Sequence, residues 1–170
     1  MRLALIRHPK PLVAAGVCYG RLELDLHPEA EAQIALAVVA LAGFAPEVVW
    51  ASPERRCAAM AAALGAPRFD DRLLELNFGA WEGLAWDDVP RAALDRWAAD
   101  PLGFAAPGGE SGAALIARVS TFYADVRADG RDAVVVSHGG PLKVLRALAS
   151  GRDVDLLAPA LAMGAVVFVP

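Results

Sequence analysis

The feature that most constrains the fold is a set of four short apolar runs in which polar and apolar residues do not alternate. A strand with one wet face alternates, whereas a strand covered on both faces reads as a continuous apolar run. Segments of helical character lie between the runs, an order typical of a mostly parallel sheet. The predicted strands are residues 3–6, 48–51, 133–137 and 165–169, and the predicted helices are residues 28–41, 53–64, 110–129 and 141–150.

The length of the chain is that of one ordinary domain. It has 170 residues, and a chain of this size buries roughly 70% of its unfolded surface without needing a disulfide or a structural metal. No repeat or linker divides it. The expected fold class is therefore α/β, with a single three-layer α/β/α domain over residues 1–170. Residues 69–109, rich in Trp, Pro and Gly, are expected to form an irregular excursion over the sheet.

Composition excludes several classes of function. A net charge of −4 gives no support for nucleic-acid binding, which needs a basic face. The two cysteines fit neither a disulfide framework nor a metal motif. The longest uncharged run, residues 33–46, is too short to span a bilayer. The sequence thus predicts a cytoplasmic protein with no nucleic-acid or membrane partner, and it indicates no oligomeric state.

Three of the predicted strands end in side chains that can bind an anion. Arg7 and His8 follow the first strand, Arg55 and Arg56 follow the second, and His138 follows the third. In an open α/β sheet, ligands bind beyond the carboxyl ends of the strands, so we expect these groups to share one crevice. Guanidinium groups bind phosphate bidentately, and helix N-termini favour anions. The pattern therefore predicts a phosphate site.

Each feature also has an ordinary structural explanation when taken alone. A histidine at a strand end is usually packed or solvated, and paired arginines on a helix usually face solvent. Gly139 and Gly140 stand before a proline, as in many turns into a helix, although their amides can also cradle an oxyanion. The sequence lacks a Walker loop, a Cys-x5-Arg loop and the HxH and HExxH metal motifs. Among phosphate chemistries, a histidine nucleophile remains.

Five stretches resemble the signatures of the histidine phosphatase superfamily, which includes the cofactor-dependent phosphoglycerate mutases. They occur in family order and span nearly the whole chain. The stretches are LIRH at 5–8, SPERRC at 52–57, LELNFGAWEG at 74–83, PGGES at 107–111 and VVSHGG at 135–140. They are similar to the family patterns LxRHG, SPLxRA, LxExxFGxWEG, PxGES and VSHGG.

The resemblance implies a role for each matched residue. His8 would attack phosphorus and become phosphohistidine. Arg7, Arg56 and His138 would hold the phosphoryl oxygens. Glu75 would protonate the leaving alcohol and then activate water. Because the arginines supply the positive charge, the resemblance implies an enzyme that needs neither a cofactor nor a metal.

The chain departs from the family pattern beside the nucleophile. Pro9 replaces the usual Gly and has no N–H to donate to phosphate. Lys10 follows it, either as a phosphate contact or as a solvated side chain. The usual Asn is missing near residues 13–14, and Glu54 stands where the family has Leu.

The resemblance extends to small bacterial members that act on α-ribazole 5′-phosphate in cobalamin biosynthesis. Residues 16–21 resemble their substrate-facing strip, so Tyr19 and Gly20 are predicted substrate contacts. Gly139, from the glycine pair whose amides can cradle an oxyanion, is a third. The three tryptophans of residues 69–109 either line an apolar wall for the leaving group or pack the loop onto the sheet. The predicted function is hydrolysis of a small phosphate monoester, and the resemblance offers α-ribazole 5′-phosphate as the candidate.

Two other functions stay open at this point. A phosphoglycerate mutase-type enzyme would return the phosphate to a second hydroxyl. The Ala-rich tail, residues 153–170, offers little material for a lid and therefore favours hydrolysis. A catalytically silent phosphate-binding module is the other alternative, motivated by Pro9 and the missing Asn.

Overall fold

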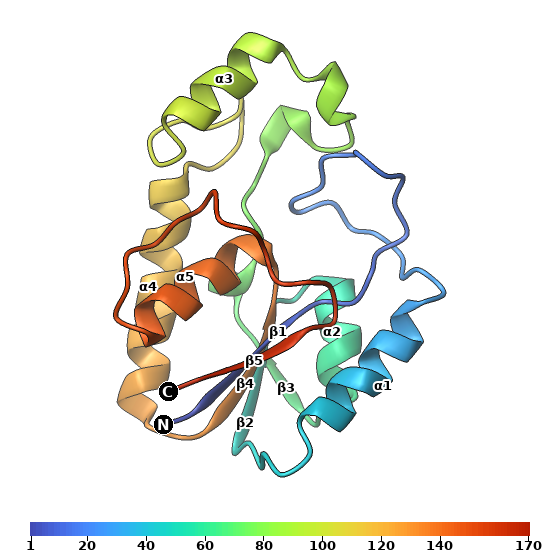
Figure 1. Cartoon of the computed structure of the whole chain (residues 1–170), viewed down its shortest axis with the longest axis vertical. Helices are drawn as coiled ribbons and strands as arrows, with labels where there is room; N and C mark the ends of the chain where they lie inside the picture. The colour runs from blue at the N-terminus through green and yellow to red at the C-terminus, as the bar shows by residue number, and fades with distance from the viewer.

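A five-stranded sheet with helices on both faces forms the centre of the molecule (Figure 1). The computed structural model describes all residues, 1–170. In space the strands follow the order β3-β2-β4-β1-β5; the first four run parallel, and β5 pairs antiparallel with β1. This confirms the α/β class with a mostly parallel sheet. The strands are β1 Leu3–Arg7, β2 Val48–Ala51, β3 Pro67–Phe69, β4 Ala133–Ser137 and β5 Val166–Val169.

The helices form the outer two layers of the sheet and one end of the molecule. In Figure 1, α4 and α5 lie on one side of the sheet, α1 and α2 lie on the other, and α3 lies beyond the strand ends. Strand β3 and helix α3 are not among the elements expected from the sequence. A three-residue edge strand and a helix within a Trp- and Pro-rich segment give too little periodicity to be found. The helices are α1 Ala30–Ala40, α2 Arg55–Ala62, α3 Arg91–Ala99, α4 Gly112–Asp129 and α5 Gly139–Ala149.

The two faces of the sheet explain why its strands do not alternate. Along β1, Leu3 and Leu5 belong to the buried cluster shared with α4 and α5. Their neighbours Ala4 and Ile6 belong to a second cluster with α1 and α2. The side chains of the central strands β1 and β4 are therefore covered by a helix layer whichever way they point, and almost no position there favours a polar residue.

Helices α2 and α5 begin at other residues than predicted. α2 begins after Glu54, whose backbone is extended, and not at Ser52–Pro53. α5 begins directly after His138 and not at Pro141, so Gly139 and Gly140 already form its first turn. The shift at α5 brings the helix start next to the end of β4, whereas α2 begins two residues farther from β2 than predicted. Both helix N-termini still lie beside residues that the sequence predicts for the site, Arg56 and His138.

The loop between β3 and α4 has a small core of its own. Trp81 is buried there with Cys18, and Trp86 stacks on Trp97 with ring planes 4° apart and centroids at 6.0 Å. The tryptophans thus pack this loop around a core of its own, and Trp97 in addition lines a cavity. No helix in the structure combines the length and the apolar character that a membrane crossing requires.

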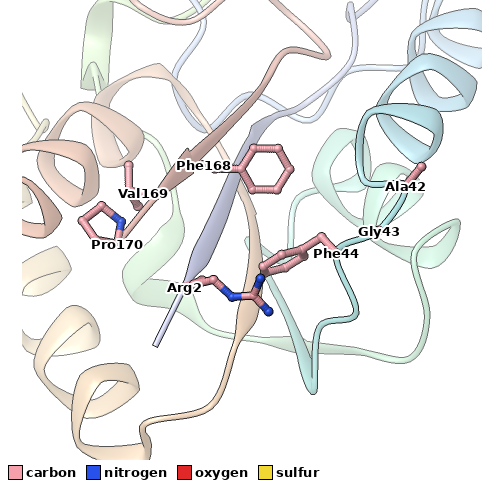
Figure 2. A pocket seen from close by; sticks show the side chains of 7 residues that line it. All are labelled: Arg2, Ala42, Gly43, Phe44, Phe168, Val169 and Pro170. Atoms are coloured by element: carbon pink, nitrogen blue, oxygen red, sulfur yellow. The ribbon is translucent and has the colours of Figure 1, made fainter.

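A wide hollow of about 490 Å³ lies where β1 begins, at the opposite end of that strand from His8. Figure 2 shows Phe44 and Phe168 on either side of it, with the Arg2 guanidinium beside Phe44. Arg2 is also bonded to Asp132, at 2.8 Å from its Nε. The hollow contains none of the residues predicted for the site.

Candidate active site

The carboxyl ends of β1, β2 and β4 lie side by side. Arg7 is in register with Ser137, and the His8 N–H donates to the Ser137 carbonyl at 3.0 Å. On the other side of β4, the Ser52 N–H donates to the Val136 carbonyl at 3.0 Å. The parallel register thus brings the three predicted strand ends together in one place.

His8 is buried and held in one tautomer. Its side chain is 1% exposed, and Nδ1 lies 2.8 Å from the carbonyl oxygen of Pro9. Because a carbonyl only accepts hydrogen bonds, Nδ1 carries the proton and Nε2 keeps its lone pair. Burial lowers the pKa of His8 to about 3, and the charges of Arg56 and Arg7 act in the same direction. The imidazole is therefore neutral at pH 7, the form a nucleophile needs.

His138 lies against His8 with the ring centroids 5.1 Å apart. Its Nε2 is 2.8 Å from the Ser52 hydroxyl, and its Nδ1 is 3.3 Å from Nη2 of Arg56. Burial, followed by the charges around it, holds the pKa of His138 well below its usual range. As the residue that precedes α5, it stands where the partial positive charge of the helix N-terminus favours an anion.

Arg56 is a fully buried cation at the start of α2. Its Nη1 donates to the Leu22 carbonyl at 2.8 Å, and its Nη2 donates to the Gly20 carbonyl at 2.6 Å. Its Nη2 also forms an ion pair with Glu54. These contacts fix the plane of the guanidinium before any ligand is bound.

The Nε atoms of Arg7 and Arg56 are buried and have no hydrogen-bond partner in the protein. The only partner of the Arg7 guanidinium is the Leu161 carbonyl, at 2.7 Å from Nη1. Leaving a charged donor unpaired in the interior is unfavourable, and an anion between the two arginines would satisfy it. The unpaired donors therefore fit a phosphate group.

Two neighbouring cations point elsewhere. Arg55 is exposed and bonds to Asp25 at 2.5 Å. Lys10 bonds to Glu29 at 3.0 Å near the surface, which agrees with the solvated alternative for this side chain. Of the cations that the sequence suggests for the site, only Arg7 and Arg56 face the buried histidines.

Glu75 approaches the strand ends from the loop that follows β3. Its carboxylate accepts the Gly140 N–H at 3.0 Å and the Leu76 N–H at 2.9 Å. A Cβ on Gly140 would come within 2.4 Å of Oε1 of Glu75, so a larger residue here would displace the Glu75 carboxylate. The Gly140 amide, which the sequence suggests as an oxyanion donor, thus holds the carboxylate of Glu75 instead.

A cavity of about 170 Å³ opens between Glu75 and the helix layer of α4 and α5. Arg7, Gly139 and Lys143 line it on the polar side. The Lys143 Nζ donates to the Leu156 carbonyl at 2.7 Å, and burial lowers the pKa of this lysine. The apolar wall comprises Leu76, Phe78, Trp97, Leu115, Leu156 and Ala160. The cavity therefore offers an apolar compartment next to the carboxylate.

Three charged residues that the sequence does not single out hold the backbone at Glu75. The Glu75 carbonyl accepts a hydrogen bond from Nε of Arg21 and another from Nη2 of Arg118, each at 3.1 Å. Both arginines pair with the Glu110 carboxylate, at 3.2 Å and 2.7 Å. The PGGES match marks Glu110, but nothing local in the sequence links it to Arg21. We call Arg21, Glu110 and Arg118 the support triad.

The predicted substrate contacts occupy different places. Gly139 lines the cavity beside Glu75. Tyr19 lies under the Arg56 guanidinium, 5.6 Å from ring centroid to Cζ, and borders a separate pocket. Gly20 binds Arg56 through its carbonyl, and a Cβ there would lie 2.1 Å from the Leu76 carbonyl oxygen. A substrate role for each of the three stays a prediction.

The C-terminal segment contributes to the site, contrary to the expectation that it offers little to cover it. Leu156 and Ala160 line the cavity, and the Leu161 carbonyl binds Arg7. The Gly164 N–H lies 3.2 Å from the His8 carbonyl. The antiparallel pairing of β5 with β1 returns this segment across the strand ends, which chain length alone does not indicate.

Comparison with known proteins places this geometry in a family context. A profile described as the histidine phosphatase superfamily (branch 1) matches residues 3–165. Glucosyl-3-phosphoglycerate phosphatase of Mycolicibacterium vanbaalenii is 32% identical over 171 residues, with 91% of this chain and 76% of that protein covered. Phosphoserine phosphatase 1 of Hydrogenobacter thermophilus is 27% identical, with 91% and 79% covered. The α-ribazole phosphatase structure from Shigella flexneri superposes with a TM-score of 0.89 at 24% identity, covering 99% and 89% of the two chains, a likeness of fold.

Proposed function

Because the chain belongs to the histidine phosphatase superfamily and is a phosphatase, we propose that it hydrolyses a small phosphate monoester without a metal, through a phosphohistidine on His8. One observation carries this proposal. Nε2 of the neutral His8 ring is unprotonated, and the ring lies beside Arg56, which is buried, and Arg7, which is partly buried; the Nε donors of both arginines have no partner. That arrangement supplies a nucleophile and the charge stabilisation that phosphoryl transfer requires.

The first half-reaction breaks the ester bond. His8 Nε2 attacks phosphorus, a P–N bond forms, and the P–O bond to the alcohol breaks. Glu75, in its protonated form, gives its proton to the leaving oxygen, since an alkoxide is a poor leaving group. Arg7, Arg56 and His138 hold the phosphoryl oxygens as their charge develops.

The second half-reaction restores the enzyme. Glu75, now a carboxylate, takes a proton from water, and the resulting oxygen nucleophile attacks phosphorus. The P–N bond breaks, inorganic phosphate leaves, and His8 returns to its neutral form. Because Glu75 donates in the first step and accepts in the second, its protonation state is the same before and after turnover.

The apolar cavity beside Glu75 favours a leaving group that carries a ring. Trp97, Phe78 and Leu115 offer the flat and aliphatic surfaces that an aromatic group packs against. α-Ribazole 5′-phosphate, whose alcohol carries such a ring, is the substrate we put forward. A serine leaving group would instead bring two opposite charges into this wall, where Lys143 is the one nearby cation besides Arg7.

The first experiment is hydrolysis of an aryl phosphate in the presence of a chelator, with the full chain and its His8→Ala variant. We expect turnover by the parent chain and a loss of about 10⁴-fold or more in the variant, because the nucleophile is removed. Equal activity of the two proteins would contradict the role of His8. Activity of the parent chain that is lost only when the chelator is present would contradict metal independence.

A panel of phosphate esters then tests the substrate. α-Ribazole 5′-phosphate, phosphoserine and glucosyl-3-phosphoglycerate are compared by kcat/KM, and we expect the first to be preferred. A preference for either of the others would move the assignment to that class of alcohol. Phosphate transfer to the second hydroxyl of a phosphoglycerate, faster than its hydrolysis, would favour the mutase alternative. Binding of esters without turnover would favour the silent module.

A further inference from the structure

Glu54 is a buried carboxylate within the anion site that the proposed reaction does not use. It precedes α2 and is 4% exposed. Its Oε2 contacts Nη2 of Arg56 as an ion pair and lies 3.4 Å from Nε2 of His138. Neither carboxylate oxygen accepts a hydrogen bond. A negative charge thus lies against two of the groups that would hold a phosphoryl group.

We propose that Glu54 is an internal competitor for Arg56, so that an oxyanion binds at the strand ends only as Glu54 takes up a proton from solvent. The inference rests on the proposed role of Arg56 in phosphate binding. It adds a proton-coupled step to substrate capture and to phosphate release. No covalent bond other than the O–H bond on Glu54 is formed.

The physical reason is repulsion between like charges in a buried place. A dianion on Arg56 and His138 would lie close to the Glu54 carboxylate, with little water to screen the two charges. The carboxylate makes no hydrogen bond that would hold it in the charged form. Protonation removes the repulsion and releases Arg56 to the ligand.

The groups that surround Glu54 allow its carboxylate to take up a proton near pH 7. Burial raises the pKa of Glu54 to about 7, and the carboxylates of Glu23, Glu75 and Glu82 act in the same direction. Arg56 is the one group that lowers this pKa. His138 faces the carboxylate from α5 as a neutral ring. Withdrawing Arg56 to a ligand therefore removes the sole influence that favours the carboxylate.

A different role would leave Glu54 charged throughout. As a permanent counter-ion, it would only orient the Arg56 guanidinium and would not respond to the ligand. The two roles differ in one measurable property, which is the number of protons taken up when an anion binds.

The test uses sulfate as the probe, because sulfate has the charge of a phosphate dianion and does not titrate between pH 6 and 8.5. Its affinity for the full chain is measured by calorimetry across that range. If binding requires protonated Glu54, the affinity falls about 30-fold from pH 6 to pH 8.5. In Glu54→Gln this fall is absent, and the two proteins bind equally at pH 6. Protons gained by His8 or His138 occur in both proteins and cancel in the comparison.

A second readout does not depend on any variant. Calorimetry of the parent chain in buffers with different heats of ionisation gives the protons taken up per sulfate. We expect close to one proton per sulfate at pH 8.5 and far fewer at pH 6.

Glu54→Leu, which restores the residue usual in the family, should behave as Glu54→Gln does. The exposed carboxylate of Glu31 serves as a control, and Glu31→Gln should keep the pH dependence of the parent.

Three results would overturn the inference. Sulfate binding without proton uptake at pH 8.5 would assign Glu54 the permanent counter-ion role and leave the phosphate site intact. An equal fall of affinity in Glu54→Gln would assign the proton to another group. No sulfate binding at pH 6 would contradict the anion site itself, and with it the proposed function.

Discussion

The two sides of the site are built by different means. The strand-end side is attached to the sheet and lies between the two helix layers. It is formed by Arg7, His8, Arg56 and His138. The loop side carries Glu75, whose backbone is held by the support triad. On the first side, hydrogen bonds of parallel strands set the positions. On the second side, ion pairs of Glu110 set them, one with Arg21 far away in the chain and one with Arg118 a short distance along it.

This difference separates binding from proton transfer. Because the sheet fixes the backbone at the strand ends, the residues of the anion site are in place before a ligand arrives. The loop depends on ion pairs that are partly exposed, with the Arg21 side chain 33% accessible, and such pairs contribute modestly. We therefore expect the two sides to respond differently to substitution, salt and pH.

The sharpest way to separate the two sides is Glu75→Gln. Turnover should fall by about 10²–10⁴-fold, because the amide cannot donate or accept the transferred proton, while sulfate affinity stays unchanged. The fall should be larger for an alkyl phosphate than for an aryl phosphate, since a phenolate leaves without a proton. Asp87→Asn removes a charge from an exposed position of the same loop and should have no such effect. Turnover within about threefold of the parent chain would exclude Glu75 as the proton donor.

On the strand-end side, Arg56→Lys should reduce both sulfate affinity and turnover. We expect about 10²–10³-fold in turnover, because an ammonium cannot reproduce the planar fork held by Gly20 and Leu22. Arg55→Lys is the matched control, since the Arg55 side chain, next to Arg56 in the sequence, is exposed and bonded to Asp25. An Arg56→Lys protein with parental sulfate affinity would remove this arginine from the anion site.

The strand-end side should also give the fold its acid sensitivity. The pKa of His8 in the folded protein is about 3, below the value of about 6.5 in an unfolded chain, so the unfolded state binds the extra proton. This contribution is complete above pH 6.5 and is lost as the pH falls toward 3, by about 1.4 kcal/mol per pH unit. His138 acts in the same direction, whereas Glu54, whose pKa is raised, opposes them between its unfolded pKa and about 7.

Denaturant unfolding of the parent and His8→Asn at several values between pH 4 and pH 7 isolates that contribution. The free energy of unfolding of His8→Asn should depend less on pH by about 1.4 kcal/mol per unit. His27→Asn, at the surface, is the control. Equal slopes for the parent and His8→Asn would mean that His8 is as easily protonated when folded as when unfolded.

The strand-end side is largely predictable from the sequence, and the loop side is not. Four of the five strands, the mostly parallel sheet and the meeting of His8 with His138 follow from apolar runs and from the rule that ligands bind at carboxyl ends. Two features do not follow from these rules. They are the hydrogen bond from the Gly140 amide to Glu75 and the return of residues 156–164 over the site. They depend on contacts between segments that are distant in sequence and carry no local pattern. The ion pair of Glu54 with Arg56 is local, but a Glu near an Arg in a sequence gives no sign that both side chains are buried.

The smallest predicted effect probes the support triad. In Glu110→Gln, the charge that holds Arg21 and Arg118 is lost, and the Glu75 backbone loses part of its anchorage. We expect kcat to fall about tenfold, because misplacing a catalytic group by about 1 Å costs up to a hundredfold, while sulfate affinity stays at the parental value. Glu29→Gln, an exposed carboxylate paired with Lys10, is the control for loss of charge. A parallel loss of sulfate affinity in Glu110→Gln would mean that the two sides are mechanically coupled, and the division between sheet-held and loop-held groups would then fail.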